Sequence, residues 1–114
     1  MLITLREILN WATENHCAVG AFNTPNLESL QAVLDAAEKL NTPVIISHAQ
    51  VHEPAMPLKE IGPYMVEAAK KASVPVCVHL DHCENAALCP GKILLLIAHG
   101  VTPKSLCKPS RFRI

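Results

Sequence analysis

The sequence is poor in net charge, in long apolar runs and in paired cysteines, and each shortage excludes a class of protein. Its ten basic residues balance its ten acidic ones, so we expect neither nucleic acid nor an anionic membrane as a partner. The longest apolar run, residues 93–98, is far shorter than the roughly 20 residues of a membrane span. Half of the residues are nonetheless apolar, and we expect one small packed domain whose partner is a small molecule or another subunit.

Signals for export and for nucleotide binding are also missing. The opening MLITLREILNW has no basic region followed by an apolar stretch, and Glu7 and Glu14 come too early for a secretory signal. We therefore expect a cytoplasmic protein with reduced thiols, and the five cysteines, odd in number and irregularly spaced, argue against a disulfide framework. The absence of GxGxxG and GxxxxGK[ST] weakens a nucleotide-binding interpretation.

What the sequence does contain is an alternation of amphipathic and fully apolar segments. Thr4 and Glu7 have the form of a capping box, Asn26 is a candidate N-cap, and apolar residues recur at helical spacing after each. A third helical segment tolerates Pro63 only with a late start or a kink. The expected helices span residues 5–16, 27–40 and 58–72, and the expected buried strands are CAVGAF, PVIIS and PVCVHL, beginning near residues 17, 43 and 75.

Strands that are apolar along their whole length and alternate with helices predict a parallel sheet covered on both faces. The fold class is therefore α/β, and the repeat suits either a doubly wound sheet or part of a (β/α)8 barrel.

Polar residues follow each apolar run at its carboxyl end, which is where parallel α/β folds build their sites. Asn23 ends the first run, and Ser47 with His48 ends the second. The third ends in HLDH, in which His79 and Asp81 share one face of the strand and His82 lies where the strand turns into a loop.

The HLDH stretch has the right groups for metal-assisted proton transfer. A neutral imidazole is a common zinc ligand, and a neighbouring carboxylate can give or take a proton. One histidine does not make a zinc site, because a catalytic zinc needs about three protein ligands. Taken alone the motif is about as often structural, and His79 is expected to be a satisfied buried residue.

The ordered set AVGAFNTPNLESLQAVLDAAEKLNTPVII followed by SVPVCVHLDHCEN closely resembles the amino-terminal part of class II, zinc-dependent ketose-bisphosphate aldolases over about residues 1–85. The resemblance implies a partial (β/α)8 TIM barrel of about three parallel β/α units. It also implies reversible cleavage of fructose or tagatose bisphosphate to dihydroxyacetone phosphate and glyceraldehyde 3-phosphate. Zn²⁺ as cofactor, a phosphorylated sugar as substrate and a homo-oligomer follow from the same resemblance.

The resemblance also implies roles for single residues. His82 looks like a zinc ligand, Asp81 like the acid/base residue at the scissile bond, and Asn23 like a residue lining the substrate pocket. Ala49 stands where some members have a serine or threonine, and Ser47 or His48 is a candidate substitute for that substrate contact. The remaining zinc ligands and the phosphate-binding loops belong to later strands of the family.

Residues 86–114 differ in composition from the segment before them. They contain no Asp or Glu, and proline interrupts the helix that should follow the third strand. We expect a divergent tail, disordered or produced by a frameshift, on a truncated aldolase fragment that is inactive alone.

Two other readings remain open at this stage. The first is a non-catalytic binding or self-associating module that exposes open sheet edges. The second is a small metal-binding protein that uses His79, His82 and cysteines.

Overall fold

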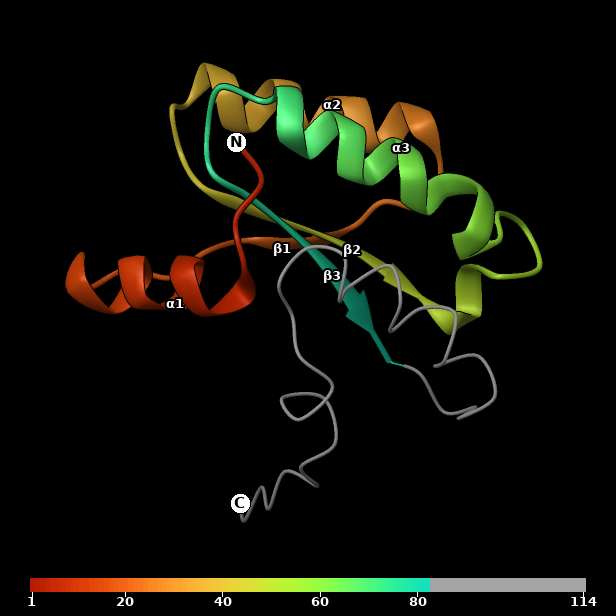
Figure 1. Ribbon diagram of the computed structural model, residues 1–114, viewed down its shortest axis with the longest axis horizontal. Coiled ribbons are helices and arrows are strands. Elements are labelled where there is room, and N and C mark those ends of the chain that lie inside the picture. The colour runs from red at the N-terminus through yellow and green to blue at the C-terminus, as the bar shows by residue number, and fades with distance from the viewer. Residues whose placement is uncertain (83–114) are drawn as a thin grey trace, which may run out of the picture.

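The computed structural model describes residues 1–82, and in it three parallel strands form a sheet with helices on both faces (Figure 1). The predicted α/β class and alternation are thereby confirmed. The sheet order is β1-β2-β3. The elements are α1 (Leu5–Glu14), β1 (Ala21–Asn23), α2 (Leu27–Lys39), β2 (Val44–Ala49), the 3-10 turn η1 (Gln50–His52), α3 (Leu58–Lys71) and β3 (Val76–Asp81).

Local side-chain chemistry starts the first two long helices where the sequence predicts. The Thr4 hydroxyl accepts a hydrogen bond from the Glu7 amide, and the Glu7 carboxylate accepts one from the Thr4 amide. Asn26 and Ser29 form the same reciprocal pair at the start of α2. Each box satisfies amides that have no partner within the first helical turn.

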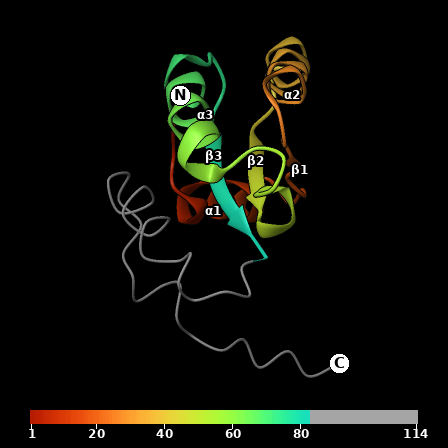
Figure 2. The same ribbon diagram turned by 90° about the vertical axis from the view of Figure 1, so that its right-hand side faces the viewer.

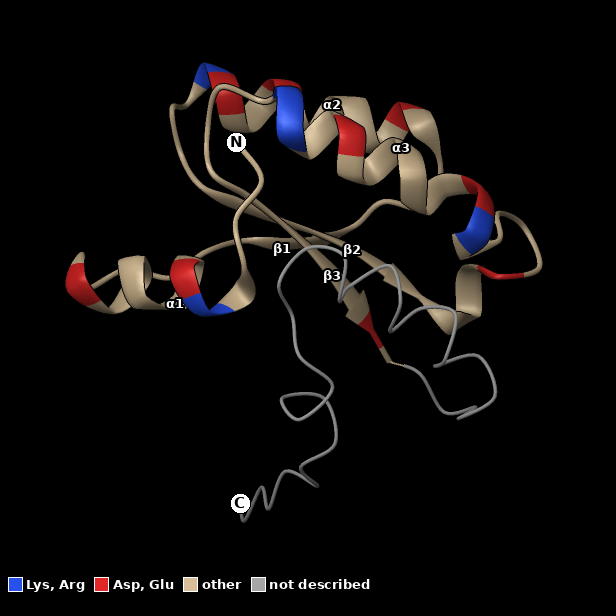
Figure 3. Ribbon diagram, viewed as in Figure 1, with Lys and Arg blue, Asp and Glu red and all other residues tan. Residues whose placement is uncertain are grey.

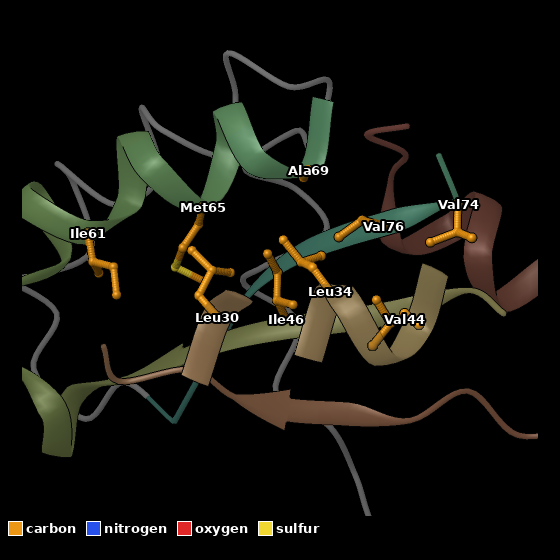
Figure 4. Packing of buried hydrophobic residues seen from close by; sticks show 10 residues of the cluster. Leu30, Leu34, Val44, Ile46, Ile61, Met65, Ala69, Val74 and Val76 are labelled. Carbon is orange, nitrogen blue, oxygen red and sulfur yellow. The ribbon is translucent and has the colours of Figure 1, made fainter. Parts of the chain in front are cut away.

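Helices α2 and α3 lie side by side over one face of the sheet, and α1 lies against the other (Figures 1 and 2). The larger core fills the space under α2 and α3, where the fully buried Ile46, Met65 and Val76 meet side chains of both helices (Figure 4). A smaller cluster of Ile8, Ile45 and Cys77 fills the face under α1. Even-numbered positions of β2 and β3 therefore face α2 and α3, and odd-numbered positions face the α1 side.

The first strand differs from its prediction. The apolar run CAVGAF was expected to form a buried strand from about residue 17, but β1 is only three residues long and its side chains are exposed. Cys17 is also exposed, not buried in a strand. β1 is an edge strand: it pairs with β2 on one side, and among the described residues no strand pairs with its other edge. Val19 still packs against the smaller cluster.

The third β/α unit contains the predicted helix and one feature that the sequence did not indicate. Helix α3 begins at Leu58 and runs through Pro63 to Lys71, so the late start considered for Pro63 does not occur. The amino-terminal residues also extend the sheet beyond β3, because the Ile3 amide donates to the Val76 carbonyl and Leu2 forms a parallel bridge with Val76.

Candidate active site

The predicted polar residues gather at the carboxyl edge of the sheet and largely on one face. Asn23, Ser47 and His79 are register partners across the three strands, so they form one row. Ala49 and Asp81 are partners in the next row toward the edge. Asp81 is the only charged residue in the three strands, while the other charges of the described chain lie on helices and connections (Figure 3).

Ser47 and His79 contact each other within the row. The Ser47 side chain is buried, and its Oγ lies 3.4 Å from His79 Nδ1, a long hydrogen bond. Burial lowers the pKa of His79, and the negative charge of Asp81 opposes that shift. His79 is thus a partly buried imidazole with a hydroxyl partner, less buried than the sequence led us to expect.

His82 lies directly after the last strand residue and returns toward Asp81. Strict alternation would send its side chain to the face opposite that of Asp81. Its φ of 36° ends the extended strand, and His82 Nε2 lies 3.6 Å from Asp81 Oδ1. The His82 side chain is 88% exposed, and that of Asp81 is 35% exposed. A solvent-accessible imidazole and a carboxylate therefore lie together at the sheet edge, on the side of the Asn23 row.

His48 does not belong to this face. It occupies an even-numbered position of β2 and is fully buried on the side of α2 and α3, so it lies away from the row that contains Ser47, the other candidate substitute for the hydroxyl missing at Ala49. Its Nε2 instead lies 3.3 Å from Glu53 Oε1, and its ring meets that of His52 edge-on at 5.4 Å between centroids. Only Ser47 of the two candidates lies in the row.

Sequence reasoning found the loop that follows β2 but missed the contacts that it makes. The Glu53 carboxylate accepts a hydrogen bond of 3.1 Å from the Leu58 amide, and the Gln50 amide donates 3.2 Å to the His82 carbonyl. Glu53 occurs in a segment with no periodicity, and the sequence shows only that a proline-marked loop exists there. A histidine at the end of an apolar run, His48, was the one sign in the sequence that a polar partner such as Glu53 would lie beside it.

Within residues 1–82 the metal-ligating groups are few. No group of three or more His, Cys, Asp or Glu side chains in that range could hold a metal ion. Nor is any described helix long and apolar enough to cross a membrane. Residues 83–114, including the predicted tail, lie outside the described residues.

Three parallel β/α units in the sheet order β1-β2-β3 form an α/β arrangement of the kind that (β/α)8 barrels contain. The chain belongs to the class-II fructose-bisphosphate aldolase family, whose family model matches residues 3–102. The predicted family is thereby confirmed.

Individual relatives agree with this assignment. The chain is 45% identical over 84 residues to a fructose-bisphosphate aldolase of Thermus caldophilus, covering 72% of this chain and 27% of that protein. It is 40% identical over 91 residues to a probable fructose-bisphosphate aldolase of Bacillus subtilis, covering 77% of this chain and 32% of that protein. The crystal structure of the YdjI aldolase of Escherichia coli K12 superimposes with a TM-score of 0.78 at 36% identity, over 83% of this chain and 37% of that one.

The chain therefore spans between a quarter and two fifths of the length of these relatives. Its structural neighbours are aldolase TIM-barrel proteins that cover part of the chain, and the three units match the partial barrel that the sequence predicts.

Proposed function

We propose that this chain supplies the first three β/α units, within about residues 1–85, of a zinc-dependent class II aldolase site. The reaction is the reversible aldol cleavage of a ketose 1,6-bisphosphate, fructose or tagatose, to dihydroxyacetone phosphate and glyceraldehyde 3-phosphate. The observation that carries the proposal is the pairing of Asp81 with His82 at 3.6 Å, beside the row of Asn23 and Ser47. Family membership supports the class of reaction.

Asp81 is the proposed acid/base group. It gives and takes the proton on the hydroxyl oxygen at the scissile carbon–carbon bond, and a partly exposed carboxylate at the strand end can reach both substrate and water. Asn23 ends β1 on the same side and is exposed, so its amide is free to orient a substrate oxygen. Ser47 is the buried member of the row, and its hydroxyl contacts His79.

The donor set of the described residues fits a zinc ion in part. The His82 imidazole is exposed and can supply one nitrogen ligand, while the usual three require further residues. When bound, zinc polarises the ketone oxygen of the substrate as a Lewis acid. His82 then holds one position of the metal beside Asp81, and the carboxylate stays close enough to work on the same substrate.

A chimaera tests these roles in a complete barrel. Residues 1–82 of this chain replace the matching segment of the Thermus caldophilus aldolase, and cleavage of both bisphosphates and zinc content are measured. We expect a chelator-sensitive aldolase in which Asp81→Asn lowers the cleavage rate about 100-fold or more and retains zinc. His82→Ala should lose both zinc and activity. His16→Ala changes an exposed histidine in the turn after α1 and should leave both unchanged.

Two results would contradict the proposal. The first is full activity of the His82→Ala chimaera with its zinc retained, which would assign the metal to other residues. The second is an Asp81→Asn chimaera that cleaves at the parent rate. For the purified 114-residue chain by itself we expect no detectable cleavage of either sugar.

A further inference from the structure

We propose that Glu53 is a positioning residue for His82, acting through the loop that joins β2 to α3; the inference rests on the proposed role of His82 as a metal ligand. The Glu53 carboxylate contacts the Leu58 amide and the His48 ring. It lies on the side of the sheet that faces α3, and its effect reaches the site through backbone hydrogen bonds.

Glu53 contacts three parts of the loop region, two through its carboxylate and one through its backbone amide. Its Oε1 accepts from the Leu58 amide at the start of α3 and lies 3.3 Å from Nε2 of the buried His48 in β2. The Glu53 amide also donates 3.0 Å to the Gln50 carbonyl, which closes the η1 turn. A partly buried carboxylate with an amide donor and an imidazole around it is a strong anchor, because hydrogen bonds to charged groups are stronger than neutral ones.

The η1 turn is joined to His82 by a backbone hydrogen bond that departs by one residue from the regular β2–β3 pattern. At the start of β2 the Val44 amide donates to the Pro75 carbonyl, 31 positions later in the chain. In a regular parallel ladder alternate residues repeat that offset, so the Gln50 amide would donate to Asp81. It donates to His82 instead, 32 positions later, where φ is 36°.

The one-residue shift places His82 in a strained backbone conformation, and that conformation sets the direction of its side chain. A residue other than glycine with positive φ is strained and persists only where its surroundings hold it. The Gln50 amide holds the His82 carbonyl, and the His52 ring accepts from the Ala49 amide at 3.3 Å next to it. Glu53 fixes this turn against α3, and the turn keeps His82 rotated toward Asp81. The carboxylate on one side of the sheet thus orients the candidate ligand on the other.

The test compares amide hydrogen exchange in the full chain and its variants, read by NMR without added metal. Glu53→Ala should speed exchange of the Gln50 amide by about tenfold, the effect of losing one hydrogen bond to a charged group. The Val44 amide, at the other end of the same two strands, should keep its rate. The coupling between the His82 amide and Hα protons, which reports φ, should move toward the extended value.

Conservative variants separate positioning from general stability. Glu53→Gln keeps an oxygen that accepts from Leu58 and should restore most of the Gln50 protection. As a control, Glu60→Ala removes an exposed acidic residue from the first turn of α3 and should change the exchange rate of the Gln50 amide less than twofold. If Glu53→Ala also speeds exchange of the Val44 amide, the Glu53→Asp variant is used in its place. Its shorter side chain keeps the charge but cannot reach the Leu58 amide, so it should speed exchange of the Gln50 amide and leave that of Val44 unchanged.

Unchanged Gln50 exchange and unchanged His82 coupling in the Glu53→Ala and Glu53→Asp chains would overturn the inference, whatever His82 binds. A separate titration with cobalt ion, a paramagnetic substitute for zinc, follows the His82 ring protons of the chimaera described above, whose later strands complete the barrel. Selective broadening at His82 supports the metal role. Its absence, together with faster Gln50 exchange in the variants, would leave the positioning inference supported and count against the proposed function alone.

Discussion

The two faces of the sheet are built from the same strands yet do different work. Toward α2 and α3, even-numbered positions such as Ile46 and Val76 form one apolar layer in the larger core. Toward α1, odd-numbered positions begin apolar with Ile45 and Cys77 and end polar with Ser47, His79 and Asp81. The side chains on the first face stay mostly apolar along the strand. Those on the second face change from apolar core residues to polar residues of the candidate site within five residues of β3.

The difference shows how one short strand can carry stability and chemistry together. Because side chains alternate, β2 places Ile46 in the core without affecting what Ser47 can reach. His48 is the exception on the helix side, and it is there that Glu53 lies beside it. Polar residues on the two faces therefore serve different purposes, one to bind and react and the other to hold a loop.

Adjacent isoleucines of β2 give the largest expected contrast. Ile46→Ala should cost about 4 kcal/mol of unfolding free energy, and Ile45→Ala about 2 kcal/mol, because Ile46 is fully buried under two helices and Ile45 packs in a smaller cluster. Urea denaturation followed by circular dichroism measures both. If Ile46→Ala is unfolded in water, Ile46→Val at about 1 kcal/mol replaces it. Equal costs would show that the two faces contribute equally.

Much of this scaffold is local enough to be predicted from sequence. The caps at Thr4 and Asn26 act within three residues of the helix start, so their chemistry is visible in the sequence. The strands that follow Pro43 and Pro75 are apolar runs, and their positions were predicted to within two residues. The carboxyl-edge rule then placed Asp81 correctly at the end of β3 and Ser47 in the carboxyl half of β2, two residues before its end.

The rest depends on pairing between distant segments. The short, exposed β1 and the bridge from Leu2 to Val76 follow from which edges are covered, and no local pattern encodes that. The row that joins Asn23 to Ser47 is set by strand register. The left-handed backbone at His82 depends on a hydrogen bond from a residue 32 positions earlier. The assigned roles of Asp81, His82, Asn23 and Ser47 stay predictions.

The reactivities of two cysteines, the buried Cys77 of β3 and the exposed Cys17, test whether the smaller cluster excludes solvent. Desolvation raises the pKa of the Cys77 thiol from 9.0 to about 11, so about 100-fold less of it is thiolate at pH 8. Cys17 is exposed in the segment before β1. We expect iodoacetamide to label Cys17 at pH 8 and to label Cys77 at least ~100-fold more slowly, as measured by peptide mass spectrometry. In urea the two rates should converge; equal rates in the folded chain would place Cys77 in contact with solvent.

The two capping boxes allow each face to be loosened separately. Thr4→Ala removes the cap of α1 and Asn26→Ala that of α2, and each should cost about 1 kcal/mol in urea denaturation. Amide exchange then distinguishes them. Thr4→Ala should speed exchange in α1, with little change in α2, and Asn26→Ala should do the reverse. Loss of protection in both helices from either substitution would mean that the faces open together.

The smallest expected effect is a change in the pKa of His79, a member of the polar row. Burial lowers the pKa of His79 below its ordinary 6.5, and Asp81 opposes the shift. Asp81→Asn removes that opposition, so the His79 pKa, followed by NMR of the ring protons, should fall further. In the parent chain the unfolded state takes up the His79 proton first, so the stability from the neutral ring is present above pH 6.5 and is lost as the pH falls below it. A His79 pKa that rises in Asp81→Asn would mean that the carboxylate does not act on the row.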